Sequence, residues 1–137
     1  MIVHVDDLLI ADNAEGLRSK VFDRLRNKFE LKELGNVRHY LGIKIEREED
    51  GSIFMSQSSY FDEIVDVAGQ RESRTSTYPL DPGYYKNEDD EPITNQDEYQ
   101  KLIGMLLYLA TNTRPDIAAS VSILSQRVSK PARSRAV

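Results

Sequence analysis

The sequence predicts an α+β fold, and three patterns support this class. Short apolar runs separated by turn signals occupy the first part of the chain, up to about residue 56. Apolar residues at helical spacing follow residue 96. A stretch without periodicity, from Gln70 to Asn95, separates the two parts. The 137 residues are enough for one ordinary domain or for a piece of a larger one.

The composition excludes several classes of protein. Hydrophobic residues make up 39% of the chain, which allows a core of limited size. Cysteine is absent, so the chain has neither a disulfide framework nor a thiolate metal site, as fits an intracellular location in the cytoplasm or nucleus. No apolar run could span a bilayer, and the first residues lack the features of a signal peptide, so neither secretion nor a membrane partner is expected.

The formal charge of −5 argues weakly against a free-standing nucleic-acid binder, but the charge is unevenly distributed. Residues 1–80 contain 11 Lys and Arg against 15 Asp and Glu, residues 81–98 contain one against seven, and residues 99–137 contain six against one. An acidic connector before a basic segment can indicate two elements with different partners. The counts alone favour the simpler interpretation of a solvated surface with uneven charge.

The chain opens with two predicted strands and a helix. "MIVHVDDLLIA" indicates short strands over 2–5 and 8–11, with Asp6 and Asp7 between them. The spacing then predicts a helix from about Ala14 to Glu30. Its expected N-terminal cap is Asp12 or Asn13, with Glu15 completing a capping box. Its core-facing side is expected to consist of Leu17, Val21, Phe22, Leu25 and Phe29.

A hairpin and a short helix are predicted next. Residues 37–45 alternate between apolar and polar side chains, as a strand with one core face does. Asp50-Gly51 is a reversal signal, after which residues 53–55 return as a second strand. Ser58 or Ser59 is expected to cap a helix over 60–68, which Gly69 ends.

The last third of the chain predicts a helical hairpin after a linker. Residues 70–95 carry three prolines and the acidic run "EDDE", and are interpreted as the linker. Helical spacing begins near Thr94 and continues to Ala110, with Gly104 expected to permit close helix packing. "TNTRP" interrupts it, and Pro115 opens a second helix that reaches Val128.

The adjacent carboxylates Asp6 and Asp7 need an explanation. Burying an unpaired carboxylate costs several kcal/mol, and two neighbouring ones also repel each other. Either both acids escape to solvent at a hairpin tip, or they bind a divalent cation such as Mg²⁺, which accepts carboxylate oxygens. By spacing alone, the solvent-exposed tip is the commoner case, because two acids form a weak motif.

The sequence segments around the two aspartates favour the metal-binding interpretation. In order, the chain contains "HVDDLLIADN", "FELKELGNVRHYLGIKIERE", "GSIFMSQSSYFDEIV", "TYPLDPG" and "YQKLIGMLLYLATNTRPDIAASVSILSQ". This series resembles the reverse transcriptase of copia-type LTR retrotransposons and runs to about residue 131. The resemblance implies a fragment of an RNA-directed DNA polymerase whose fold is a partial polymerase palm followed by a thumb-like helical hairpin.

The resemblance also implies a domain organisation. Residues 1–80 would be the C-terminal part of the palm with the hairpin that supports the primer, and 81–95 an acidic linker. Residues 96–131 would be the thumb-like segment, and 132–137 a basic tail.

Roles for individual residues follow from the same resemblance. The family motif Tyr-Val-Asp-Asp corresponds to His4, Val5, Asp6 and Asp7, so both aspartates would help to hold catalytic Mg²⁺. In the family, one metal activates the primer 3′-hydroxyl and the other binds the triphosphate. His4 would lie beside the primer end in place of tyrosine, which changes the shape and hydrogen bonding there.

An RNA template paired with a DNA primer is the partner that the resemblance implies. Tyr40, Gly42 and Lys44 lie in the stretch expected to contact the primer, with a bulge as the other interpretation of Gly42. The basic helices would grip duplex phosphates, since these attract Lys and Arg whatever the sequence. The candidates there are Lys101, Arg114, Arg127 and Lys130.

Departures from the family limit the expected activity. No counterpart of the third metal-binding aspartate or of the fingers precedes Met1, so Mg²⁺ binding should be weak or absent and the chain inactive alone. The exposed sheet edge near residues 2–11 predicts self-association. The alternative function is a non-catalytic remnant that binds nucleic acid or protein. A reading frame without a current role is the third hypothesis.

Overall fold

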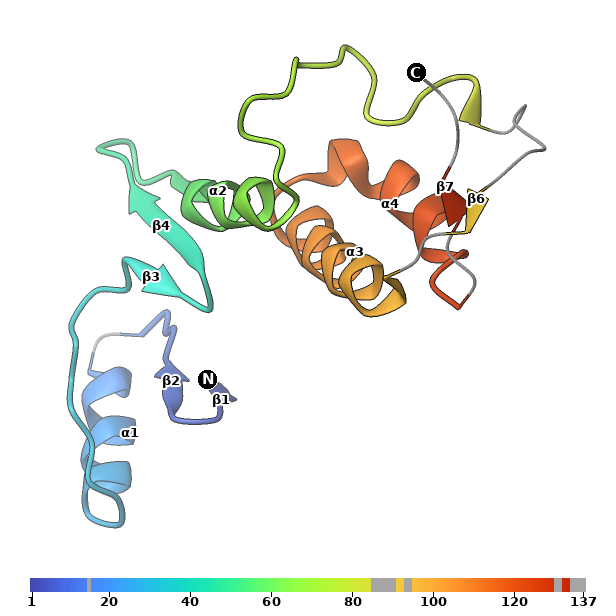
Figure 1. Cartoon of the computed structure of the whole chain (residues 1–137). Helices are drawn as coiled ribbons and strands as arrows, with labels where there is room; N and C mark the ends of the chain where they lie inside the picture. Colours follow the sequence, from blue (N-terminus) through green and yellow to red (C-terminus); the bar gives the residue numbers. More distant parts are fainter. Residues whose placement is uncertain (15, 85–90, 93–94, 130–131, 134–137) are drawn as a thin grey trace. The chain divides into compact units, whose positions relative to one another are not determined.

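The computed structural model describes residues 1–14, 16–84, 91–92, 95–129 and 132–133 (Figure 1). Contacts divide the chain into two compact units, Met1–Tyr40 (the first unit) and Leu41–Val137 (the second unit). Within the described ranges the fold is a mixture of helices and small antiparallel sheets, which confirms the predicted mixed class. No helix in those ranges is long and apolar enough to cross a membrane.

The first unit begins with the predicted hairpin. Strand β1 (Ile2–His4) pairs antiparallel with β2 (Asp7–Leu9), so that Ile2 faces Leu9 and His4 faces Asp7. Both strands are shorter than predicted. Asp7 belongs to β2 rather than to the reversal, because the turn uses only Val5 and Asp6.

Helix α1 (Leu17–Arg26) is shorter than the predicted 14–30, and its predicted cap is wrong. The N-cap is Gly16 in a left-handed conformation (φ 76°), and no side chain caps the helix. The Leu17 amide donates to the Ala14 carbonyl, so a turn separates Asp12 and Asn13 from the first helical residues. Glu15 lies outside the described residues.

The predicted core-facing stripe of α1 is only partly covered. Val21, Phe22 and Leu25 are half-buried, whereas Leu17 is 45% exposed and Phe29 is 60% exposed. No residue of α1 is buried. The spacing therefore predicted the right face, but this unit supplies too little apolar surface to cover it. Strand β3 (His39–Tyr40) ends the unit.

The second unit opens with the other predicted hairpin. Strand β4 (Ile43–Arg47) pairs antiparallel with β5 (Ile53–Ser56), with Ile45 opposite Met55. The reversal at Asp50-Gly51 is confirmed: Gly51 has φ 85°, and the Asp50 carboxylate accepts the Ser52 amide at 2.8 Å. A single strand over 37–45 is wrong, because positive φ angles at Leu41 (51°) and Gly42 (76°) turn the chain.

Helix α2 (Ser58–Val67) follows β5 directly. Its N-cap is Gln57 and lacks a side-chain cap bond, so capping by Ser58 or Ser59 is wrong, since both already have helical positions. Its predicted end is confirmed. Gly69 has φ 64° and its amide donates to Asp66, while the Gln70 amide donates to Val65, which is the Schellman arrangement.

The order of the helical segment agrees with the prediction, but its last helix ends at Ser125 rather than at Val128. Helix α3 (Gln96–Asn112) is capped by Asn95, whose side chain accepts the Glu98 amide at 3.2 Å. The 3₁₀ helix η2 (Pro115–Ile117) and helix α4 (Ala118–Ser125) follow, with Pro115 at the opening turn as predicted. Short strands β6 (Glu91–Pro92) and β7 (Ala132–Arg133) pair antiparallel. Thr94 lies outside the described residues.

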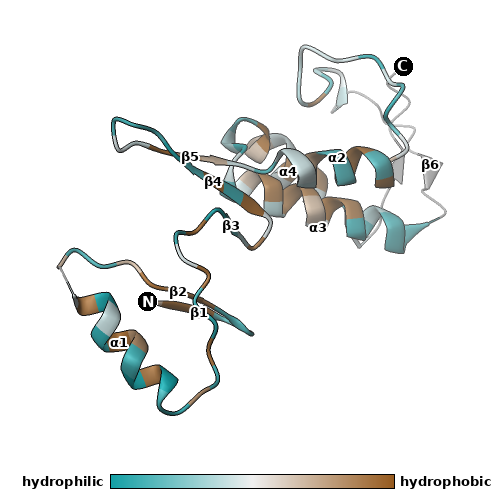
Figure 2. Cartoon of the chain, turned by 90° about the vertical axis from the view of Figure 1, so that its left-hand side faces the viewer, coloured by the Kyte–Doolittle hydropathy of each residue, from teal (hydrophilic) through white to brown (hydrophobic). Residues whose placement is uncertain are grey.

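The core belongs to the second unit and is centred on α3. Figure 2 shows apolar residues in brown along α3 and, in the first unit, along β1, where they are exposed. Among the described residues, six apolar ones are buried: Ile64, Tyr84, Ile103, Leu109, Ala110 and Val121. Gly104 is not a packing glycine, because a Cβ built there meets nothing within 4 Å.

Candidate functional site

The β1–β2 hairpin places the two aspartates at a tight reversal. Asp6 lies in the turn, Asp7 is the first residue of β2, and Asp7 faces His4 across the pair. All three side chains are exposed. The neighbouring carboxylates thus avoid the cost of burial and remain accessible to a cation or to a ligand.

The turn itself carries strain. Val5 has φ 49°, in the left-handed region that a β-branched residue rarely adopts, and it is 84% exposed. Backbone strain of this kind costs about 1–3 kcal/mol and is concentrated at functional sites. The reversal is short because only Val5 and Asp6 connect the strands, and this shortness brings Asp6 and Asp7 to the very end of the hairpin.

Asp6 and Asp7 are the right kind of ligand for Mg²⁺, but two carboxylates are too few to hold the ion. Carboxylate oxygens are the donors that Mg²⁺ prefers, but the ion needs a near-octahedral set of oxygens. Within the described part of the chain, no group of three or more His, Asp or Glu side chains could hold a metal ion. Asp6 and Asp7 therefore do not constitute a metal centre by themselves.

The residues predicted to contact a primer have different surroundings. Tyr40 is half-buried in β3, and its hydroxyl has no hydrogen-bond partner among the described residues. Gly42 lies in the turn before β4, where its φ of 76° favours glycine. Lys44 is exposed on β4 and forms an ion pair with Glu46 at 2.8 Å. The Tyr108 hydroxyl donates to the Leu41 carbonyl, which ties this turn to α3.

The basic candidates lie on separate elements. Lys101 is exposed on α3. Arg114, before η2, forms a two-pronged pair with Asp116, and this hydrogen bonding raises the pKa of Arg114 and lowers that of Asp116. The guanidinium of Arg127 lies 5.1 Å from the centre of the Tyr84 ring. Lys130 lies outside the described residues.

Gln57 was missed by sequence reasoning. It is the buried polar residue of the described core, 4% exposed, and its Oε1 accepts the Thr113 hydroxyl at 2.8 Å. A lone Gln between a strand and a helix carries no periodicity or spacing signal, so only its environment in three dimensions identifies it.

Comparison with known proteins gives the family. Residues 1–82 match the reverse transcriptase (RNA-dependent DNA polymerase) family, a match that covers more than half of the chain. The chain belongs to this family. The predicted copia-type retrotransposon reverse transcriptase is thereby confirmed, because the relatives include Pol polyproteins of plant transposons.

Three relatives of this reverse transcriptase chain show how far the similarity extends. An uncharacterized mitochondrial protein of Arabidopsis thaliana is 30% identical over 96% of the chain and 54% of its own length. The retrovirus-related Pol polyprotein from transposon TNT 1-94 of Nicotiana tabacum is 28% identical over 97% of the chain but 11% of its own length. The corresponding polyprotein from transposon RE1 of Arabidopsis thaliana is 32% identical, with 96% and 9% covered.

The chain thus spans about half, or much less, of the length of these relatives. No solved structure matches it. The reverse transcriptase match includes the β1–β2 hairpin, β4, β5 and α2, whereas α3 and α4 lie beyond its last residue.

Proposed function

We propose that these residues form the C-terminal part of the palm and the thumb of an RNA-directed DNA polymerase. In this proposal residues 1–80 are palm, 81–95 a linker, 96–131 the thumb-like segment and 132–137 a basic tail. Asp6 and Asp7 are two of the carboxylates of its metal centre, and His4 lies beside the primer end. The location is intracellular, in the cytoplasm or nucleus.

The observation that carries the proposal is the exposed Asp6-Asp7 pair at the end of a tight hairpin, within the segment that matches the family. Because the described residues supply only two suitable carboxylates, two-metal nucleotidyl transfer requires further ligands. The 137 residues alone are therefore expected to be inactive. In a longer polymerase, this hairpin would supply its two carboxylates to a complete centre.

A metal-binding experiment tests the site without requiring activity. Mn²⁺ added to the purified chain should broaden the NMR signals of residues 5–8 selectively, and the double variant Asp6→Asn/Asp7→Asn should abolish this effect. Asp12→Asn is the matched control, because Asp12 is another exposed carboxylate of the first unit. Broadening that is equal at Asp12 and at the hairpin would contradict the assignment.

Primer extension tests the expected inactivity. The purified chain, with an RNA template, a DNA primer, deoxynucleotides and Mg²⁺, should give no extended product. Extension that disappears in Asp6→Ala would overturn this expectation and would make the two carboxylates sufficient for catalysis.

Duplex binding is the second part of the proposal. Lys101 is the described thumb candidate without an ion-pair partner in the described part of the chain, so it should contribute most to phosphate contact. Lys101→Glu should weaken binding to an RNA–DNA duplex and reduce the salt slope by roughly one unit per lost phosphate contact. Lys20→Glu, the same change at an exposed residue of α1, is the control. Equal effects of both variants would argue against a specific thumb contact.

Self-association through β1 is the third part. Ile2 and Val3 are exposed on a strand that pairs only with β2 among the described strands, so one edge of β1 is open. Sedimentation at several concentrations should show dimers that Val3→Lys removes. Leu34→Lys, at an exposed residue outside any strand, should leave them intact. A strict monomer at all concentrations would exclude this contact.

A further inference from the structure

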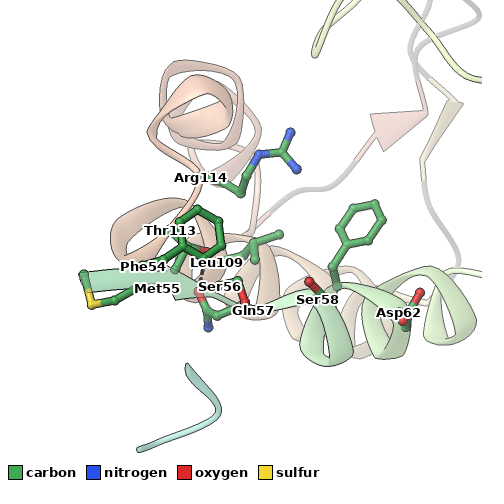
Figure 3. Close-up of a pocket in the computed structure, with 10 residues that line it drawn as sticks. Phe54, Met55, Ser56, Gln57, Ser58, Asp62, Leu109, Thr113 and Arg114 are labelled. Carbon is green, nitrogen blue, oxygen red and sulfur yellow. Dashed lines mark hydrogen bonds between the residues drawn. The ribbon is translucent and has the colours of Figure 1, made fainter. Parts of the chain in front are cut away.

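The second unit contains a cavity of about 300 Å³ between β5, the start of α2 and the end of α3 (Figure 3). Its walls are largely apolar, from Phe54, Met55, Phe61 and Leu109. Gln57 and Asp62 add polar groups. Phe54 and Phe61 supply the two aromatic rings of its lining. This volume is at the lower end for small-ligand pockets and would accept one large apolar side chain.

The cavity lies beside the C-terminal end of β5, a strand with a free edge among the described strands. Three consecutive residues of the strand line it, Phe54, Met55 and Ser56. The next two residues, Gln57 and Ser58, line it as well, so the cavity lies where β5 ends and α2 begins. Among the described strands β5 pairs only with β4, so this edge lacks a partner strand in that part of the chain.

Residues of this edge strand are unusually apolar for an exposed position. Ile53, Phe54 and Met55 are all exposed large hydrophobic residues. An exposed apolar edge strand is a template for pairing with another chain, and soluble proteins normally protect such edges with charge or proline. The sequence of β5 carries neither. A peptide that pairs with β5 as an added strand would form hydrogen bonds with the free backbone groups of this edge and would also cover its exposed apolar side chains.

A buried donor at the same place lacks an acceptor. Gln57 lines the cavity and its Oε1 is used by Thr113, but its Nε2 is buried without a hydrogen-bond partner among the described residues. A buried unsatisfied amide costs about 1–3 kcal/mol. A backbone carbonyl of an added segment is an acceptor of the right kind for this amide.

The charges around the cavity favour a basic occupant over a phosphate. Asp62 is exposed, and no Lys or Arg forms an ion pair with it within the described residues. Arg114 also lines the cavity, but Asp116 already binds its guanidinium through two nitrogens. The charge of Arg71 also acts on Asp62, but Asp66 pairs with Arg71, so the net local charge stays negative, which repels nucleic-acid phosphates and attracts Lys or Arg.

We propose that β5 and this cavity bind an extended, basic peptide segment of another polypeptide. The segment adds a strand to the free edge of β5, places one large apolar side chain in the cavity that Phe54 and Phe61 line, and sets a Lys or Arg against Asp62. This is recognition by strand addition, in which the main chain provides affinity and a side-chain pocket provides specificity. It is independent of the proposed polymerase function.

The test uses fluorescein-labelled heptapeptides of the form Thr-Val-Lys-X-Lys-Val-Thr, with Phe, Trp or Leu at X, and fluorescence anisotropy with the purified chain. At least one peptide should bind. Exchange of both Lys for Glu, or of the residue after X for Pro, should abolish binding, because the first reverses the charge and the second removes a ladder donor. Bound peptide should also slow amide exchange in residues 53–56.

Paired variants locate the site. Asp62→Lys should weaken binding by roughly two- to fivefold, as the loss of an exposed ion pair does, whereas Glu63→Lys on the same helix should not. Phe61→Ala should also weaken it, and Phe29→Ala, at an exposed aromatic of the first unit, should not. All four positions are exposed, so circular dichroism should show unchanged folds.

Three results would overturn the proposal: no peptide of the series binds at millimolar concentration, Asp62→Lys and Glu63→Lys have the same effect, or a seven-nucleotide single-stranded DNA displaces the peptide. The last would assign the cavity to nucleic acid instead. Because none of these variants alters Asp6 or Asp7, failure here leaves the metal-binding and primer-extension tests unaffected.

Discussion

The two units differ in how much of themselves they bury. Every buried residue of the described chain, including Gln57 and Leu109, belongs to the second unit. None of the described residues among the first 40 is buried, although that unit has a hairpin and a helix with an apolar face. The segment with Asp6 and Asp7 therefore has secondary structure without a core.

The two aspartates of the hairpin and the buried core therefore lie in different units. Chains below about 40 residues usually need disulfides, metals or association to remain folded. The first unit has 40 residues, and the chain has no cysteine. By itself, this unit is therefore expected to be marginally stable.

The largest expected effect tests this contrast directly. The substitution Leu109→Ala should lower the free energy of unfolding by about 2–5 kcal/mol, because it leaves a cavity in the core. Leu109 lies on α3 and is only 2% exposed. Leu17→Ala on α1, where the side chain is 45% exposed, should cost much less. Urea unfolding of both variants measures the difference. Equal losses would mean that the first unit has a core of comparable quality.

A pair of glycines gives the next largest effect. Gly42→Ala should destabilise the second unit by about 1–2 kcal/mol, because φ is 76° there and a Cβ disfavours the left-handed region. Gly104→Ala should instead be neutral or stabilise α3 by up to about 1 kcal/mol, since its position is helical and open. Thermal unfolding compares the two. A neutral Gly42→Ala would show that the turn before β4 tolerates another conformation.

Sequence reasoning succeeded where one local signal determined the structure. Asp50-Gly51 predicted a reversal, Gly69 a helix end and Pro115 a helix start, and each has its expected backbone role. These signals succeed because the conformational limits of Gly and Pro act on their immediate neighbours. The order of strands and helices followed from such signals combined with apolar spacing.

Predictions from the sequence were wrong or incomplete where residues far apart in the chain determine the local structure. Capping by Asp12, Asn13, Ser58 or Ser59 is chemically reasonable, but Gly16 and Gln57 occupy the cap positions. The stripe of α1 is amphipathic, yet spacing cannot show whether a partner surface exists to bury it. Gln57 became visible only through Thr113, 56 residues away. For Asp6 and Asp7, the solvent-exposed hairpin tip that spacing favoured is present, whereas their role as metal ligands stays a prediction from the family resemblance.

A hydrogen bond within the second unit gives a smaller effect. The Tyr99 hydroxyl donates to the Leu124 carbonyl at 2.9 Å and joins α3 to α4, and burial raises the pKa of Tyr99. Tyr99→Phe should cost about 0.5–1.5 kcal/mol, the usual net value for one such bond. Tyr78→Phe is the control, because Tyr78 is an exposed tyrosine of the same unit. Denaturant unfolding should resolve the difference, and an unchanged midpoint for Tyr99→Phe would mean that water replaces the bond.

The smallest effect concerns acid stability after α2. Hydrogen bonds from Arg71 lower the pKa of Asp66 below its ordinary value of 3.8. A lowered folded-state pKa stabilises the fold above the unfolded value, and this contribution is lost as the pH falls through the lowered pKa. Below about pH 4 the wild-type second unit should therefore lose a small part of its unfolding free energy. The variant Asp66→Asn has no carboxylate at this position and should not show this loss. Asp62→Asn, at a carboxylate of the same helix without an ion pair among the described residues, should retain the wild-type acid profile. If Asp66→Asn and the wild type lose stability in parallel on acidification, the exposed pair contributes nothing and the core alone holds this unit together.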